Sequence, residues 1–298
     1  MRFLLALGVV LAGAGPAFAA PEPDLAYAAY QRGAYVAARR EATARVERDA
    51  KDAAALTLLG ELTLQGLGTR QDPLKAAEWY RRAAALGDAR ALSTLGLMAI
   101  DGRGMAKDVA QGRAWLEQAA ERGDPQAAYN LALILLGTGA APDLTRAVGL
   151  LRRAAEAEIG DAQHALGVLY QKGRGVTRDP AEAARLFLRA TTNGNVAGEV
   201  EYAILLFNGE GVPANEPRAA RYFIRAAAKG NAIAQNRLAR LFAAGRGVPR
   251  NPVEAAAWHL VASGQGLADT WLDQALRTLT PEERAKAERL AGERAGNI

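Results

Sequence analysis

The sequence contains no cysteine, only two histidines and only two serines. Without cysteine, neither a disulfide framework nor a lipid anchor attached to a cysteine can form. His164 and His259 lie in no H-E-x-x-H or similar spacing, so the common zinc sites are excluded. Neither Ser93 nor Ser263 lies in a G-x-S-x-G motif, the usual setting of a hydrolase nucleophile. We therefore expect no metal, no cofactor and no catalytic residue.

Aromatic residues are also scarce, at 6%, although half of all residues are hydrophobic and alanine dominates. This composition favours close packing of helix against helix over packing of sheets. The 37 basic and 32 acidic residues are interspersed, and no basic stripe with interleaved aromatics is present. We expect an all-α fold and no nucleic-acid partner.

The amino-terminal residues have the order of a secretory signal peptide. Arg2 precedes the apolar run Phe3 to Ala14, and Ala17-Phe18-Ala19 offers an A-x-A cleavage site before Ala20. The run is too short to span a bilayer stably. We expect residues 1–19 to be removed and the mature protein to be periplasmic or secreted, without stable membrane insertion.

The rest of the chain contains an internal repeat, marked by two series of turns. The spacing in the first series is 36 residues, with one step of 35, and the second series runs in step with the first. Two turns per period indicate two helices per repeat. The first series consists of paired glycines with one residue between them: Gly66/Gly68, Gly102/Gly104, Gly137/Gly139, Gly173/Gly175, Gly209/Gly211 and Gly245/Gly247. The second consists of Gly87-Asp88, Gly123-Asp124, Gly160-Asp161, Gly194-Asn195 and Gly230-Asn231.

Each kind of turn has its own physical basis. In the second series, the glycine can end one helix in the left-handed conformation while the following Asp or Asn caps the next helix. In the first series, G-x-G reverses the chain, and the next helix begins at pairs such as Asp72-Pro73 or Asp179-Pro180. The repeats therefore predict stacked helical hairpins.

The apolar residues of the hairpins also recur. The first helix has a small residue four positions before a large one, as in Ala91/Leu95, and the second has a large pair, as in Trp79-Tyr80 or Leu186-Phe187. Aromatics that return at the repeat period indicate packing between hairpins more strongly than a cofactor site.

These segments, among them LGELTLQGLGTRQDPLKAAEWYRRAAALGD, closely resemble the Sel-one-like repeats, a longer relative of the tetratricopeptide repeats. The resemblance implies a right-handed α/α superhelical solenoid of six hairpins. The expected repeats are 53–88, 89–124, 125–161, 162–195, 196–231 and 232–266. A degenerate hairpin turning at Gly33 (20–52) and a carboxy-terminal segment (267–298), with a capping box at Thr280, should cap the two ends.

The resemblance to tetratricopeptide arrays also implies that the first helices line a concave face. On that face we expect an apolar furrow with a polar border, suited to a helix or an extended peptide. The alternative, left open at this stage, is that neighbouring first helices partly cover these residues. The predicted partner-binding residues are Leu97, Leu133, Val168, Ile204, Ile100, Leu136, Phe207, Tyr129, His164 and Arg240.

The resemblance therefore implies a monomeric, non-enzymatic scaffold or adaptor that binds another protein or peptide. Exported members of the family include regulators that bind the periplasmic part of a sensor kinase, and scaffolds of envelope complexes. One alternative is an enzyme-like role on cell-wall or β-lactam substrates, as credited to cysteine-rich relatives; the absence of cysteine here weighs against it. Another is a secreted factor that binds host proteins through the same furrow.

Overall fold

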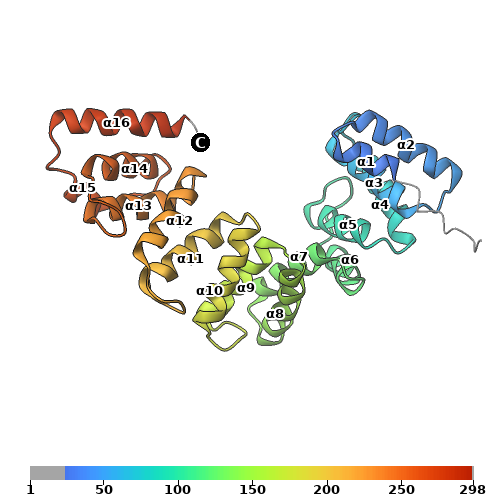
Figure 1. The fold of residues 1–298 in the computed structure, drawn as a ribbon. Helices are drawn as coiled ribbons and strands as arrows, with labels where there is room; N and C mark the ends of the chain where they lie inside the picture. The colour runs from blue at the N-terminus through green and yellow to red at the C-terminus, as the bar shows by residue number, and fades with distance from the viewer. Residues whose placement is uncertain (1–23, 297–298) are drawn as a thin grey trace, which may run out of the picture. The chain divides into compact units, whose positions relative to one another are not determined.

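The structure is a computed structural model that describes residues 24–296, and the predicted signal peptide lies outside the described residues. Within residues 24–296 the chain forms sixteen α-helices and no strand (Figure 1). The predicted all-α fold of a repeat solenoid is confirmed. The helices divide into two compact units, residues 1–86 and 87–298, each with its own core.

The described part of the first unit consists of two helical hairpins. As predicted, the chain turns at Gly33, which has a φ of 74°. Tyr30 and Tyr35 pack edge to face beside this turn, with ring centroids 5.8 Å apart, and the first hairpin packs against the second through α2 and α3. The helices are α1 (Leu25–Gln31), α2 (Tyr35–Arg48), α3 (Ala53–Gln65) and α4 (Pro73–Ala85).

The second unit contains five successive hairpins and two further helices, drawn from teal to red in Figure 1. Each helix packs against its hairpin partner and against the neighbouring hairpin, and α16 packs on α14. The helices are α5 (Ala89–Asp101), α6 (Val109–Glu121), α7 (Pro125–Thr138), α8 (Ala141–Glu156), α9 (Gly160–Lys172), α10 (Pro180–Thr192), α11 (Val196–Asn208), α12 (Glu216–Ala228), α13 (Ala232–Ala244), α14 (Pro252–Gly264), α15 (Thr270–Ala275) and α16 (Pro281–Ala295).

The helix ends form where the turn residues predict them. Asp88 accepts a hydrogen bond from the backbone N–H of Ala91 at 2.7 Å, and Asn231 accepts one from Ala234 at 2.9 Å. Each bond satisfies an N–H that has no partner inside the helix. Before α16, Thr280 and Glu283 form the predicted capping box.

The second glycine of several G-x-G pairs also lets neighbouring hairpins approach closely. Gly211 has a φ of 72°, and a Cβ placed on it would lie 2.1 Å from the carbonyl oxygen of Pro180, at the start of α10. Gly247 stands in the same relation to Glu216, at 2.4 Å. Any side chain here would therefore need both an unfavourable φ and space that the preceding hairpin occupies.

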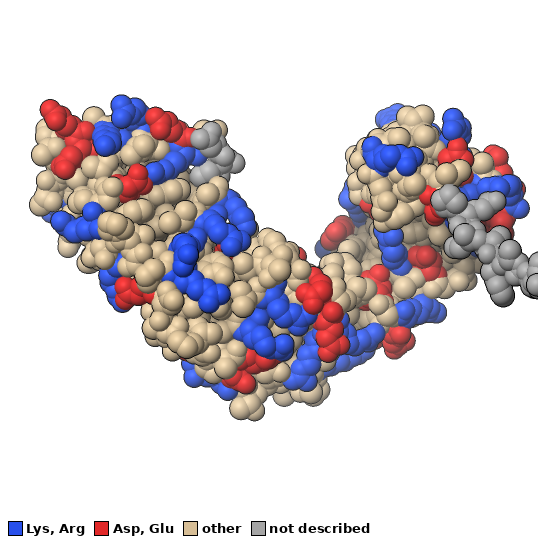
Figure 2. All heavy atoms as spheres, viewed as in Figure 1, with Lys and Arg blue, Asp and Glu red and all other residues tan. Residues whose placement is uncertain are grey.

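The apolar pattern fills the core as predicted. The small and large residues of the first helices are buried, and so is the second member of each large pair in the second helices. Phe187 packs so closely on Gly167 of the neighbouring helix that a Cβ there would lie 2.6 Å from its ring. The recurring aromatics therefore serve packing. Charged side chains of both signs are interspersed over the visible surface (Figure 2).

Two glycines in the third repeat do not act as predicted. Gly137 lies inside α7, and Gly139 alone ends that helix, with a φ of 71°. Because only Gly139 and Ala140 separate α7 from α8, the second helix starts early and is longer than those of the other repeats. Gly160 is the first residue of α9, after the cap residue Ile159, so it does not end α8.

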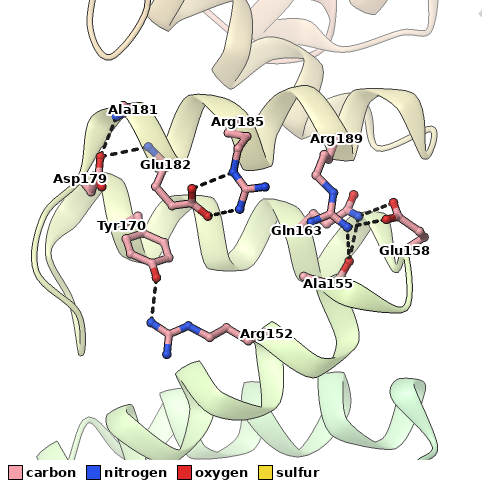
Figure 3. Close-up of polar contacts among 10 residues, drawn as sticks. All are labelled: Arg152, Ala155, Glu158, Gln163, Tyr170, Asp179, Ala181, Glu182, Arg185 and Arg189. Atoms are coloured by element: carbon pink, nitrogen blue, oxygen red, sulfur yellow. Dashed lines mark hydrogen bonds and ion pairs between the residues drawn. The ribbon is translucent and has the colours of Figure 1, made fainter.

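The left-handed position at the end of α8 falls instead on Glu158, with a φ of 61°. Its carboxylate accepts a hydrogen bond from Gln163 at 2.8 Å and forms an ion pair with Arg189 (Figure 3). It also accepts a hydrogen bond from Asn193 at 2.6 Å. Arg189 also donates to the carbonyl oxygen of Ala155 at 2.8 Å. These bonds join α8, α9 and α10 at the helix end that Gly160 was predicted to form.

Candidate functional site

The candidate site lies on the first helices of the hairpins in the second unit: α5, α7, α9, α11 and α13. Leu97, Leu133, Val168 and Ile204 occupy the same position of successive first helices, and Arg240 occupies it in α13. These four apolar residues are called the apolar row below. Because the hairpins repeat in register, residues at one position of each first helix fall on the same side of the stack.

The apolar row is only partly packed. Leu97 and Leu133 are exposed to 38% and 44% of their surface, whereas the leucines two positions earlier in the same helices, Leu95 and Leu131, are 1% exposed. Val168 and Ile204 are half-buried and pack against the core. Neighbouring first helices therefore do not cover the two leucines, although they partly cover the valine and the isoleucine. Partner binding by the row stays a prediction.

Ile100, Leu136 and Phe207 form a second row, and all three are half-buried. Ile100 packs against Gly112 of α6, where an added Cβ would lie 2.6 Å from it. Phe207 has the guanidinium of Arg246 4.2 Å from its ring centroid. The side chains of this second row are therefore less exposed to solvent than those of Leu97 and Leu133.

The two predicted polar members, Tyr129 and His164, lie on neighbouring first helices and are both half-buried. Burial lowers the pKa of His164, while the nearby Asp161 acts in the opposite direction. Burial, with a contribution from the same aspartate, raises the pKa of Tyr129. Both shifts favour the neutral side chains, which suit a partly apolar contact surface.

At the carboxy-terminal end, Ile204, Phe207 and Arg240 line a cavity of about 260 Å³. Of the ten predicted residues, these three alone line it, and the other seven are spread along α5, α7 and α9. Among the lining residues that sequence reasoning did not assign to the site are Arg237, Arg246 and Trp271. Arg246 is the middle residue of a G-x-G turn, and Trp271 lies in α15, beyond the repeats, so the repeat pattern gave no signal for either.

Arg240 is held in place beside this cavity. Its Nε and Nη2 donate to the two carboxylate oxygens of Asp269 at 2.6 and 2.9 Å, and its guanidinium lies 5.3 Å from the ring centroid of Trp271. Burial opposes ionisation of Asp269, but the hydrogen bonds from Arg240 and Asn236 outweigh it and lower its pKa to about 2. The pair therefore remains charged and fixes α15 against α13.

His259 is buried, with Nε2 2.7 Å from Oδ1 of Asp273. Its other ring nitrogen is also buried and has no hydrogen-bond partner in the part of the chain that the structure describes. No group of three or more His, Cys, Asp or Glu side chains that could hold a metal ion occurs between residues 24 and 296.

Over the same span, no helix combines the length and the apolar character needed to cross a membrane.

Comparisons with known proteins agree with this architecture. A family model described as Sel1 repeat matches residues 53–88, 89–124, 125–158, 160–195, 196–231 and 232–267. Among solved structures, the chain is similar to a Sel1 repeat protein from Oxalobacter formigenes, with 26% identity, coverage of 81% of this chain and 97% of that chain, and a TM-score of 0.68. It is also similar to a protective antigen of uropathogenic Escherichia coli with an SLR fold, with 26% identity and a TM-score of 0.56. That match covers 88% of this chain and 64% of the antigen. No curated protein matches.

Proposed function

We propose that this chain, which belongs to the Sel1 repeat family, is a non-enzymatic adaptor that binds another protein through the apolar row and the residues beside it. Proteins built from Sel1 repeats act as protein–protein interaction scaffolds.

One observation carries the proposal: Leu97 and Leu133 are exposed at equivalent positions of consecutive hairpins. A large aliphatic side chain at either position loses the free energy that burial would give, about 1.5–3 kcal/mol for a leucine. The neighbouring leucines at 95 and 131 show that these helices can bury such side chains fully. Exposure that repeats in register is therefore consistent with a surface that a partner covers.

We also propose that the protein is exported, because residues 1–19 have the order of a signal peptide. In that compartment, candidate partners are the periplasmic part of a sensor kinase, an envelope complex or, after secretion, a protein of a host. We propose that the adaptor is a monomer and that its partner is a protein and not nucleic acid.

Site-directed photo-crosslinking in the producing cells tests the proposal. A photoreactive phenylalanine analogue replaces Leu133 in one variant and Arg185 in a second. Arg185 is an exposed residue of α10, a second helix, so it serves as the matched control. We expect a discrete crosslinked protein from position 133 that is absent from position 185. Equal patterns at the two positions, or none at 133, would contradict binding through this face.

A further inference from the structure

We infer that the cavity beside Arg240 binds an acidic segment of a protein partner, with one bulky apolar side chain inserted into the cavity and an adjacent carboxylate held by arginines. This inference rests on the proposed function and specifies the chemistry of the partner.

The size and lining of the cavity suit a single side chain. Its volume of about 260 Å³ lies below the range of about 300–1,000 Å³ typical of pockets that enclose a whole small molecule or cofactor. Phe223 and Leu241 contribute apolar surface from the core, and the exposed Ala244 adds a short side chain to the lining. A cavity of this kind fits an apolar anchor side chain of a bound protein.

The charged side chains among the described residues that line the cavity are all basic. Three arginines and no acidic residue line it in the described part of the chain. Arg240 is paired with Asp269, and Arg246 with Glu216. Arg237 is exposed. Burial raises the pKa of the half-buried Glu201 on the preceding first helix, and the positive charge of Arg237 acts in the opposite direction. Arg237 is thus the arginine best placed to bind an incoming carboxylate, because the other two are already paired with carboxylates of the protein.

The aromatic rings of the cavity are already occupied on one face. The guanidinium of Arg246 lies 4.2 Å from the Phe207 centroid, and that of Arg240 lies 5.3 Å from the Trp271 centroid. A nucleotide base that stacks on an aromatic side chain needs an open ring face. The two arginines therefore leave less ring surface for a stacked base, and the apolar lining is better suited to an apolar side chain.

The position of the cavity connects it to the proposed binding face. Ile204 is the last member of the apolar row and also lines the cavity, and Arg240 follows it at the equivalent position of α13. A protein segment that lies along the row would therefore reach the cavity at the carboxy-terminal end. This continuity identifies the occupant as part of the same partner.

The inference can be tested with synthetic peptides and the purified full chain. The probe is a fluorescein-labelled nonapeptide with Phe-Asp at the centre of a Gly-Ser host, and its matched versions contain Phe-Asn or Ala-Asp. We expect the Phe-Asp peptide to bind about tenfold more tightly than either matched peptide, because each of them loses a charged hydrogen bond or an apolar anchor. Fluorescence anisotropy gives the affinities.

Two variants locate the site. Arg237→Gln should remove the preference for Asp over Asn, and Ala244→Trp should block the insertion of Phe. Both residues are exposed, so the melting temperatures should remain those of the wild type. Arg221→Gln, which removes an exposed arginine of α12 outside the cavity lining, should leave every affinity unchanged.

Equal affinities for the Asp and Asn peptides, or an Asp preference that survives Arg237→Gln, would overturn the inference, as would the absence of binding. The crosslinking at position 133 separates this failure from that of the proposed function. A crosslink without peptide discrimination overturns the cavity assignment alone, whereas peptide discrimination without a crosslink overturns binding through the apolar row.

Discussion

Asn193 donates a hydrogen bond of 2.6 Å to the carboxylate of Glu158, across the boundary between the third and fourth repeats. Glu158 has a left-handed backbone, an unusual conformation for a residue with a side chain, and it is the one non-glycine residue with positive φ among the described residues. Its carboxylate also binds Gln163 and Arg189. The irregular turn is therefore stabilised by side chains of the following hairpin.

This arrangement predicts a pH-dependent contribution to stability. Hydrogen bonds from Asn193, Gln163 and Arg189 lower the pKa of Glu158 from 4.5 to about 2. Because the folded-state pKa is the lower one, the stabilisation is fully present above about pH 4.5 and decreases as the pH falls towards 2. Glu158→Gln should therefore destabilise the protein at pH 7 and much less at pH 3. Urea unfolding at both pH values measures this.

The control for that experiment is Glu156→Gln, which removes an exposed carboxylate from the same helix end. It should have little effect at either pH. If Glu158→Gln lowers the free energy of unfolding equally at pH 7 and pH 3, the carboxylate does not act through its ionised form.

The G-x-G turns predict a difference between two kinds of glycine. Gly211→Ala places a Cβ 2.1 Å from the carbonyl oxygen of Pro180, in addition to its positive φ, whereas Gly123→Ala meets no atom within 4 Å. Gly123→Ala introduces only backbone strain and should lower the free energy of unfolding by about 1 kcal/mol. Gly211→Ala adds the steric clash and should lower it by about 3 kcal/mol. Denaturant unfolding distinguishes them. Similar losses for both would mean that the neighbouring hairpin moves aside freely.

The Arg240–Asp269 pair predicts how α15 is attached. Asp269→Ala removes both bonds to Arg240 and the cap of α15. We expect a loss of about 2 kcal/mol in the free energy of unfolding, because hydrogen bonds to a charged partner are broken. Asp101→Ala, at an exposed site in α5, serves as the control. An unchanged melting temperature for Asp269→Ala would show that α15 is held by apolar contacts alone.

Much of the fold follows from local signals in the sequence. A cap residue such as Asp88, or a glycine such as Gly173, determines a helix end within a few residues of itself, so the hairpins could be predicted without a structure. The predictions that Gly137 and Gly160 lie in turns were wrong. A glycine can also lie inside a helix, as Gly137 does, or begin one, as Gly160 does. The shortened turn before α8 changed the register of the residues that follow.

The candidate site was less predictable because its exposure depends on neighbouring hairpins. The repeat places Leu133 and Ile204 at equivalent positions, yet one is exposed and the other is half-buried. The cavity depends further on α15, which lies beyond the repeats and brings Trp271 beside Arg240. Contacts of this kind join segments that share no sequence pattern.

The measurement that tests the central claim most directly compares Leu133→Glu with Leu131→Glu, recording melting temperature and capture of the crosslinked partner on the same samples. Leu131 is 1% exposed and Leu133 is 44% exposed, on the same helix. We predict that Leu131→Glu lowers stability by 3 kcal/mol or more, as a rough figure for a carboxylate placed in the core. Leu133→Glu should melt like the wild type and lose about a hundredfold in partner affinity. Unchanged capture by a normally folded Leu133→Glu variant would contradict binding through the apolar row.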